Sequence, residues 1–266
     1  MRVINLASGS KGNATLVEHG SSSILIDAGL SMKELELRLV RAGRSLDEIS
    51  AIVVSHDHDD HIKSISRISN KYKIPVYASA ECFFSSKLCL VDILNRRNIG
   101  VEDFFVGDIR IETIELSHDA TKTLGFVFHC DGNKVSLVTD LGYIDELILS
   151  KLMGSNLVMI ESNYDENMLM SGPYPLILKK RISSRMGHLS NNACASAVLE
   201  LSKRGTKFFM LMHLSETNNS PEIAYNTIMR CLYDEYGEEN KVRVMMAEQN
   251  DVSPNFLFKH REEGKI

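Results

Sequence analysis

Three histidines and an aspartate that are suited to metal binding lie within the run His56-Asp57-His58-Asp59-Asp60-His61. Imidazole nitrogen and carboxylate oxygen are good ligands for divalent ions such as zinc, manganese or iron(II). The alternation predicts that His56 and His58 point toward one position, while Asp60 and His61 turn toward a second. Four ligands from so short a segment cannot all reach one ion without strain. We therefore expect two divalent metal ions about 3.5–4 Å apart.

The alternative interpretation of this run is a solvated polar loop that opens a helix. Acidic residues are favoured at the first turn of a helix by its dipole, and this explains Asp57 and Asp59. We assign those two residues no catalytic role. A solvated loop does not explain three histidines at this density, so metal binding is the stronger interpretation.

The elements that must position these ligands are strands, and further metal-competent residues lie where predicted strands end. Alternating or continuous apolar residues predict strands over 23–26, 51–55, 109–116, 134–139 and 207–212. The residues at or next to the ends of these strands are Asp27, His56, His118, Asp140 and His213. A rigid sheet can direct residues from distant parts of a chain to one point. Five such residues at five strand ends indicate one functional site.

The remaining pattern predicts alternating strands and helices without a linker or repeat. Further strands are expected over 2–7, 14–18, 124–130 and 157–160. Asp131-Gly132-Asn133 predicts a hairpin between two strands. Ser31 and Glu34 have capping-box spacing, which predicts a helix to about Ala42. Ile62, Ile65 and Ile68 predict a helix directly after the His/Asp run. We expect a single α/β (α+β) domain over residues 1–266.

Composition limits the class of protein. The formal net charge of −5 argues against a protein that coats DNA, but it permits an enzyme that holds a phosphate locally. The sequence has no window near the roughly 18 apolar residues of a membrane span, and its start does not resemble a signal peptide. The five cysteines are scattered and odd in number, which is typical of reduced thiols. We expect a cytoplasmic protein.

His188 is a further candidate for catalysis. It precedes a predicted helix that begins at Ser190 or Asn191, and helix N-termini favour anions such as phosphate. A nearby imidazole can protonate a leaving oxygen as general acid. The spacing alone equally fits a polar residue beside a helix cap. Upstream, the basic residues of 179–181 and Arg185 fit either a solvated face or neutralisation of a nucleic-acid backbone.

The run from Ser55 to His61 resembles the H-x-H-x-D-H signature of the metallo-β-lactamase superfamily, and the later single residues follow in that family's order. The resemblance implies an αββα sandwich of two mixed β-sheets flanked by helices, spanning nearly the whole chain. It also implies a hydrolytic mechanism in which a hydroxide between two metals attacks a carbonyl or phosphorus centre, since metal binding lowers the pKa of water from about 15.7 toward about 7.

The resemblance also assigns the ligands. It implies that His56, His58 and His118 hold one metal, that Asp60, His61 and His213 hold the other, and that Asp140 bridges the two. It implies that Asp27 orients a ligand from outside the coordination sphere. Asp60 and His188 are the residues to which it gives catalytic roles.

Further motifs narrow the resemblance. True β-lactamases usually replace the aspartate at position 60 and use a cysteine ligand, so the chain departs from them. The late pair His188 and His213 is similar to that of the tRNA 3′-processing endonucleases. The segments 7–13, 161–163 and 172–175 more closely resemble the bacterial YycJ/WalJ (VicX-like) proteins, which are regarded as exonucleases or DNA-processing phosphodiesterases.

The leading hypothesis is therefore a dinuclear phosphodiesterase or exonuclease that uses Zn²⁺, Mn²⁺ or Fe²⁺ and acts on nucleic acid, with DNA as the expected substrate. Hydrolysis of a thioester or lactone, or processing of tRNA, would use the same metals with different pocket walls. A regulatory metal-binding protein without turnover is the non-enzyme alternative, and the complete ligand set argues against it.

Overall fold

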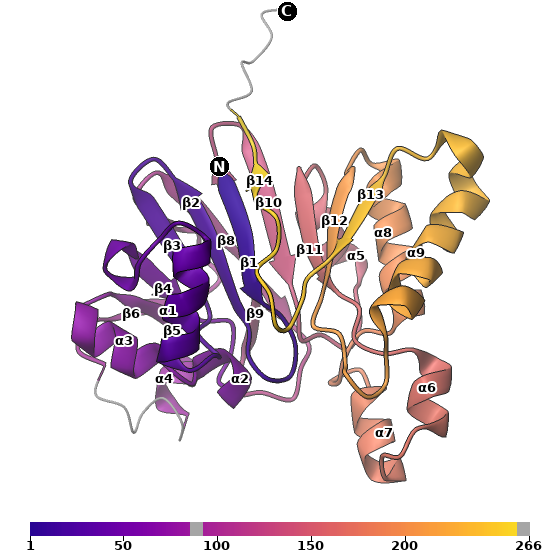
Figure 1. Cartoon of the computed structure of the whole chain (residues 1–266), viewed down its shortest axis with the longest axis horizontal. Helices are drawn as coiled ribbons and strands as arrows, with labels where there is room; N and C mark the ends of the chain where they lie inside the picture. The colour runs from indigo at the N-terminus through magenta and orange to yellow at the C-terminus, as the bar shows by residue number, and fades with distance from the viewer. Residues whose placement is uncertain (86–92, 260–266) are drawn as a thin grey trace, which may run out of the picture. The chain divides into compact units, whose positions relative to one another are not determined.

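The computed structural model describes residues 1–85 and 93–259, which group into two compact units. The first unit comprises Met1–Glu115, Ala120–Asn133 and the described residues from Glu248 onward; the second comprises Leu116–Asp119 and Lys134–Ala247. Across these residues the strands form two mixed β-sheets flanked by helices, as the sequence predicts. Figure 1 shows the helices and strands, coloured from indigo at the N-terminus to yellow at the C-terminus.

The first unit contains one complete sheet with the strand order β14-β1-β2-β3-β4-β5-β6. Its strands are β1 (Arg2–Ala7), β2 (Ala14–His19), β3 (Ser22–Ile26), β4 (Ala51–Val53), β5 (Val76–Ser79), β6 (Arg96–Ile99) and β14 (Phe256–Leu257). Pairing is antiparallel from β14 to β3 and parallel from β3 to β6. Parallel β3 and β4 therefore end at the same edge, which brings Asp27 and the His/Asp run together.

Helices cover a face of this sheet and complete its core. They are α1 (Met32–Arg41), α2 (Asp59–Ile62), α3 (Ile65–Tyr72) and α4 (Ala80–Phe84), with the 3₁₀ turn η1 (Leu46–Glu48). Leu35 and Leu39 of α1 and Ile65 of α3 are fully buried against Leu25 and Ile52 of the strands. The same unit holds β7 (Phe104–Val106), β8 (Ile109–Leu116, whose last residue falls in the second unit) and β9 (Thr123–Cys130). These belong to the second sheet, in the order β9-β8-β7.

The second unit contains the strand order β13-β12-β11-β10, paired in parallel throughout. Its strands are β10 (Asn133–Val138, whose first residue falls in the first unit), β11 (Leu157–Glu161), β12 (Phe208–Met212) and β13 (Arg243–Met246). Its helices are α5 (Glu146–Leu152), α6 (Glu166–Ser171), α7 (Leu176–Ile182), α8 (Asn191–Lys203) and α9 (Pro221–Tyr236), with the 3₁₀ turn η2 (Gly237–Glu239). Since parallel strands present their carboxyl ends at one edge, residues that follow β10, β11 and β12 converge there.

The predicted helix after the His/Asp run is in fact two helices, α2 and α3, and the break has a local cause. The backbone carbonyl of Asp60 accepts a hydrogen bond from Asn13 N (2.8 Å), so it is engaged outside the helix. The N–H of Ser64, four residues later, donates instead to Ala28 O (3.0 Å). A continuous helix would need these two groups to bond to each other.

The other predicted elements agree with the structure to within one or two residues, and β8 has the predicted bounds. Asp131 and Gly132, which link β9 to β10, both have positive φ (50° and 69°), as the expected hairpin turn requires. Ser31 caps α1 by accepting from Glu34 N (3.3 Å), whereas the Glu34 carboxylate bonds Arg38. Cys82, Cys130, Cys194 and Cys231 are free thiols; Cys89 lies outside the described residues. Among the helices described, none has the length and apolar content needed to cross a membrane.

Candidate metal centre

The predicted ligands of the first unit lie on the loop and short helix that follow β4. His56 and His61 are fully buried, and their ring centroids are 4.1 Å apart. The ring of His58, which is the N-cap of α2, lies 4.7 Å from that of His56. Asp60 belongs to the first turn of α2, and its carboxylate lies 3.6 Å from His61 Nε2. The structure therefore brings all four residues together.

Asp27 is buried at the end of β3 and contacts this group. Its carboxylate accepts hydrogen bonds from Ser55 N and Ser55 Oγ, both at 2.8 Å. It also lies 2.7 Å from His61 Nδ1. A hydrogen bond donated by Nδ1 to a carboxylate places the imidazole lone pair on Nε2, which is the arrangement found around metal-ligating histidines.

The turn at 8–13 packs against the same loop through Asn13. The Asn13 amide donates to His61 Nε2 (3.0 Å) and to Asp60 Oδ2 (3.3 Å), while its carbonyl oxygen accepts from Gly9 N (2.9 Å). Asn13 thus contacts two predicted ligands. The sequence pattern did not single out Asn13 for this role.

The carboxylate of Asp57, a residue to which we assign no catalytic role, bonds the segment at Thr121 in the first unit. Its carboxylate accepts from Thr121 Oγ1 (2.9 Å) and Thr121 N (3.3 Å). Burial alone would raise the pKa of Asp57, but the hydrogen bonds from Thr121 and Ser85 outweigh burial and lower it. The side chain anchors the neighbouring segment of the first unit.

A second group of ligands forms at the carboxyl edge of β10, β11 and β12. Asp140, Glu161, His188 and His213 each offer one ligand atom, and these atoms all lie within 4.8 Å of one another. His188 precedes α8, whose N-cap is Ser190, as predicted. The predicted residues Asp140, His188 and His213 therefore meet in the second unit.

Glu161 is the member of this group that the sequence reasoning missed. It is fully buried and accepts from Leu189 N (2.9 Å), and it lies 2.9 Å from His188 Nδ1 and 2.8 Å from His213 Nδ1. Burial alone would raise the pKa of Glu161, but the charge of His188 and hydrogen bonds from both histidines lower it to about 2. The sequence does carry a signal for this site residue, because Glu161 is an acidic residue directly after the apolar segment 157–160.

His118 and His188 of the second unit each have Nδ1 close to an oxygen acceptor. His118 Nδ1 lies 2.9 Å from the carbonyl oxygen of Gly187, and His118 Nε2 lies 3.8 Å from Asp140 Oδ1. The side chain of His188 is 21% exposed. Burial would lower the pKa of His188, but the Glu161 carboxylate raises it by more, so the net shift is upward. This favours a protonated imidazole that solvent or substrate can reach.

Three of the strand-end residues have a backbone conformation that residues other than glycine rarely adopt. Asp27, Asp140 and His213 have φ values of 59°, 61° and 53°, in the left-handed region. The surrounding sheet and hydrogen bonds hold them there. Backbone strain of this kind is common at functional sites.

The donor set fits divalent metal ions. His61, His118 and His213 each have Nδ1 close to an oxygen acceptor, an arrangement that places the imidazole lone pair on Nε2, the atom that would coordinate a metal. Carboxylates stand beside the imidazoles in both groups. Zinc, manganese and iron(II) all accept this mixture of nitrogen and oxygen ligands.

The family model described as Beta-lactamase superfamily domain matches residues 22–214. This range includes every predicted ligand.

The chain belongs to the metallo-β-lactamase superfamily.

Two curated members of this superfamily are similar to the chain over most of their length. It is 36% identical to Exodeoxyribonuclease YycJ of Bacillus anthracis, over 85% of this chain and 87% of that protein. It is 35% identical to Exodeoxyribonuclease WalJ of Streptococcus pneumoniae serotype 2, over 85% of this chain and 86% of that protein. Within the superfamily, this metallo-β-lactamase-fold hydrolase therefore belongs with the YycJ/WalJ proteins, as the sequence motifs indicated.

A solved structure with the same fold is the metallo-β-lactamase fold protein YhfI from Bacillus subtilis, with a TM-score of 0.71 over 95% of this chain and 99% of that one. The identity of 14% limits this similarity to the fold. As a superfamily member with its His/Asp groups in place, the chain is a metal-dependent hydrolase.

Proposed function

We propose that this hydrolase is an exodeoxyribonuclease, which cleaves phosphodiester bonds of DNA from an end. The observation that carries the proposal is similarity, over most of both chains, to two proteins named exodeoxyribonucleases. The geometry supports it, because His188 is reachable and stands beside Asp140 and His213, where the scissile phosphate would be bound. We also propose that the chain works as one domain in the cytoplasm, where thiols stay reduced.

We propose that the ligand assignment implied by the family resemblance holds in this chain, with two ions that are Zn²⁺ or Mn²⁺, or else Fe²⁺. The proposed ligands are His56, His58, Asp60, His61, His118, Asp140 and His213. Bound metal would supply Lewis acidity and lower the pKa of water at the site. The chain's own contribution is to hold the imidazoles in one tautomer, as Asp27 does for His61 and Glu161 does for His213.

His188 is proposed as the general acid that protonates the leaving oxygen. The Glu161 carboxylate binds Nδ1 of His188 and raises the pKa of His188, which favours a proton on Nε2 of the same ring. Proton donation to an alkoxide leaving group contributes typically about 10²–10⁴-fold to a rate.

The decisive experiment uses a 5′-end-labelled linear DNA duplex and a covalently closed circular DNA, each incubated with purified protein and Mn²⁺ or Zn²⁺. We expect release of label from the linear duplex, an intact circle, and complete inhibition by a chelator. Survival of the linear DNA with every metal, together with hydrolysis of a thioester, lactone or precursor tRNA, would contradict the proposal. Bound metal without hydrolysis of any ester would instead support a regulatory protein.

Substitution of His188 should lower the rate of hydrolysis much more for DNA than for a substrate with a good leaving group. We expect His188→Gln to lower kcat on DNA by about 10²–10³-fold, because the leaving sugar oxygen needs a proton. The loss should be much smaller on bis(p-nitrophenyl) phosphate, whose leaving group needs none. Metal content of the variant, measured by elemental analysis, serves as the control. Equal losses on both substrates would show that His188 acts in some other way.

A further inference from the structure

The helix α7, directly upstream of His188, has side chains that the second unit leaves unburied. None of its residues is buried, and Leu176 and Ile177 are 59% and 84% exposed. Its last turn carries Lys179, Lys180 and Arg181. Within the second unit, α6 and α7 project together away from the strands β10 to β13 (Figure 1). A basic and apolar helix in this position has a surface available for a partner.

A cavity of about 210 Å³ lies between this helix and His188. Its lining includes Tyr174, Leu178, Arg181, Ile182, Asp119 and His188. The cavity is smaller than the roughly 300–1,000 Å³ of sites for drug-sized ligands, so it suits a fragment such as a single base. It opens directly beside the imidazole proposed as the general acid.

The lining combines the two kinds of group that bind unpaired nucleotides. Tyr174 offers an aromatic face and Leu178 an apolar wall, and a base can stack on or pack against both. Arg181 offers a guanidinium, which binds phosphate through paired hydrogen bonds. Arg181 is 59% exposed and ion-paired with Asp119, which is 25% exposed; since solvent reaches the guanidinium, a phosphate can compete with Asp119 for it.

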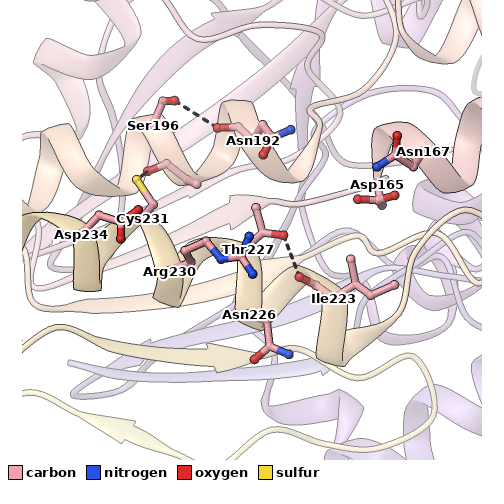
Figure 2. Close-up of a pocket in the computed structure, with 11 residues that line it drawn as sticks. Asp165, Asn167, Asn192, Ser196, Ile223, Asn226, Thr227, Arg230, Cys231 and Asp234 are labelled. Carbon is pink, nitrogen blue, oxygen red and sulfur yellow. Dashed lines mark hydrogen bonds between the residues drawn. The ribbon is translucent and has the colours of Figure 1, made fainter. Parts of the chain in front are cut away.

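Another cavity of the second unit provides a comparison. It has a volume of about 570 Å³ and lies between α8 and α9 (Figure 2). Its lining includes Arg230, but also the carboxylates of Asp165 and Asp234 and the amides of Asn192 and Asn226. Carboxylates repel a nucleic-acid backbone, and the lining of this cavity has two of them and no aromatic residue. The cavity at α7 has one carboxylate, Asp119, whose charge is paired with Arg181. The charge and the ring at α7 therefore favour the smaller cavity for DNA.

We propose that Tyr174 and Arg181, with the apolar α7 residues Leu178 and Ile182, form a subsite for an unpaired nucleotide at the end of a DNA strand. The base would stack on Tyr174 and its phosphate would bind Arg181, which directs the adjoining phosphodiester toward His188. This inference rests on the proposed exonuclease function and deepens it, because it assigns recognition of a frayed or single-stranded end to a defined surface.

The test measures binding of metal-loaded protein to a fluorescein-labelled oligothymidylate with phosphorothioate linkages that resist hydrolysis. We expect Tyr174→Ala and Arg181→Ala each to raise the Kd by about tenfold, as loss of one stacked base or one phosphate contact does. Tyr174→Phe keeps the ring and should bind like the unaltered protein. Arg230→Ala, the same charge loss at the cavity in Figure 2, should also leave the Kd unchanged.

The outcomes separate the subsite from the enzyme's activity. Unaltered Kd values in both alanine variants, with DNA hydrolysis intact in the unaltered protein, would overturn the subsite and leave the proposed function standing. Weakened binding in those variants without any DNA hydrolysis would retain the subsite and overturn the function. If the variants bind the oligonucleotide normally but no longer sediment with anionic phosphatidylglycerol vesicles, α7 serves a lipid surface and the proposal is wrong.

Discussion

Substitution of Asp60 by alanine is expected to lower the rate of DNA hydrolysis by about 10³-fold or more while leaving the protein folded. A bound metal contributes several kcal/mol of transition-state stabilisation, and each 1.36 kcal/mol corresponds to about a factor of ten in rate. The Asp60 side chain is partly exposed in α2 and packs in no apolar core, so its removal should not disturb the sheet. Release of label from end-labelled linear DNA, with circular dichroism on the same samples, measures both effects.

The neighbouring carboxylate supplies the matched control. Asp59 stands beside Asp60 in the same turn of α2, is exposed and has no assigned role. Asp59→Asn should retain near-normal hydrolysis, whereas His58→Ala should behave like Asp60→Ala. Near-normal activity in either Asp60→Ala or His58→Ala would be incompatible with the two-metal mechanism.

Substitution of Gly29 by alanine is expected to disrupt the segment 56–61, because Gly29 lies against the backbone of Asp60. A Cβ at Gly29 would lie 1.6 Å from the backbone oxygen of Asp60 and 2.3 Å from its carbonyl carbon. Backbone atoms cannot rotate away as a flexible side chain can, so the loop that carries His58, Asp60 and His61 must move. Overpacking a core costs typically about 1–3 kcal/mol, and a clash with backbone belongs at the upper end.

We therefore expect Gly29→Ala to lower Tm by about 6–12 °C, since 1 kcal/mol corresponds to about 2–4 °C in domains of somewhat smaller size. It should also reduce the metal content of the purified protein. Gly100 provides the control in the same unit, because a Cβ there would meet open space. Thermal unfolding and elemental analysis of both variants check this expectation. An unchanged Tm and metal content in Gly29→Ala would contradict the close approach of the two segments.

The sequence predicted most of the fold and most of the candidate ligands, because both depend on local pattern. The alternation in β8 and the apolar segments before Asp140 and His213 are properties of neighbouring residues, and the resemblance fixed how the sheets are arranged. The break between α2 and α3 was not predictable, since it depends on hydrogen bonds from Asn13 and Ser64 to partners far away in the sequence.

Glu161 escaped prediction for a related reason. A glutamate after an apolar strand usually marks the point at which the strand reaches solvent. Here two histidines from later segments cover it and keep its charge buried. Likewise, nothing in the local pattern around Tyr174 indicates that it lines the same cavity as His188, since that depends on how α7 and the segment before α8 are folded together.

The left-handed backbone at Asp27, Asp140 and His213 has a consequence for attempts to engineer the protein. Glycine adopts this conformation without the steric cost that an aspartate or histidine bears, so each of these positions has a replacement that relaxes the chain. A laboratory selection for thermostability alone accepts glycine wherever relief of the backbone outweighs the lost side-chain hydrogen bonds, and glycine at Asp140 or His213 would remove a proposed metal ligand. Screens for more thermostable variants should therefore select for hydrolytic activity at the same time.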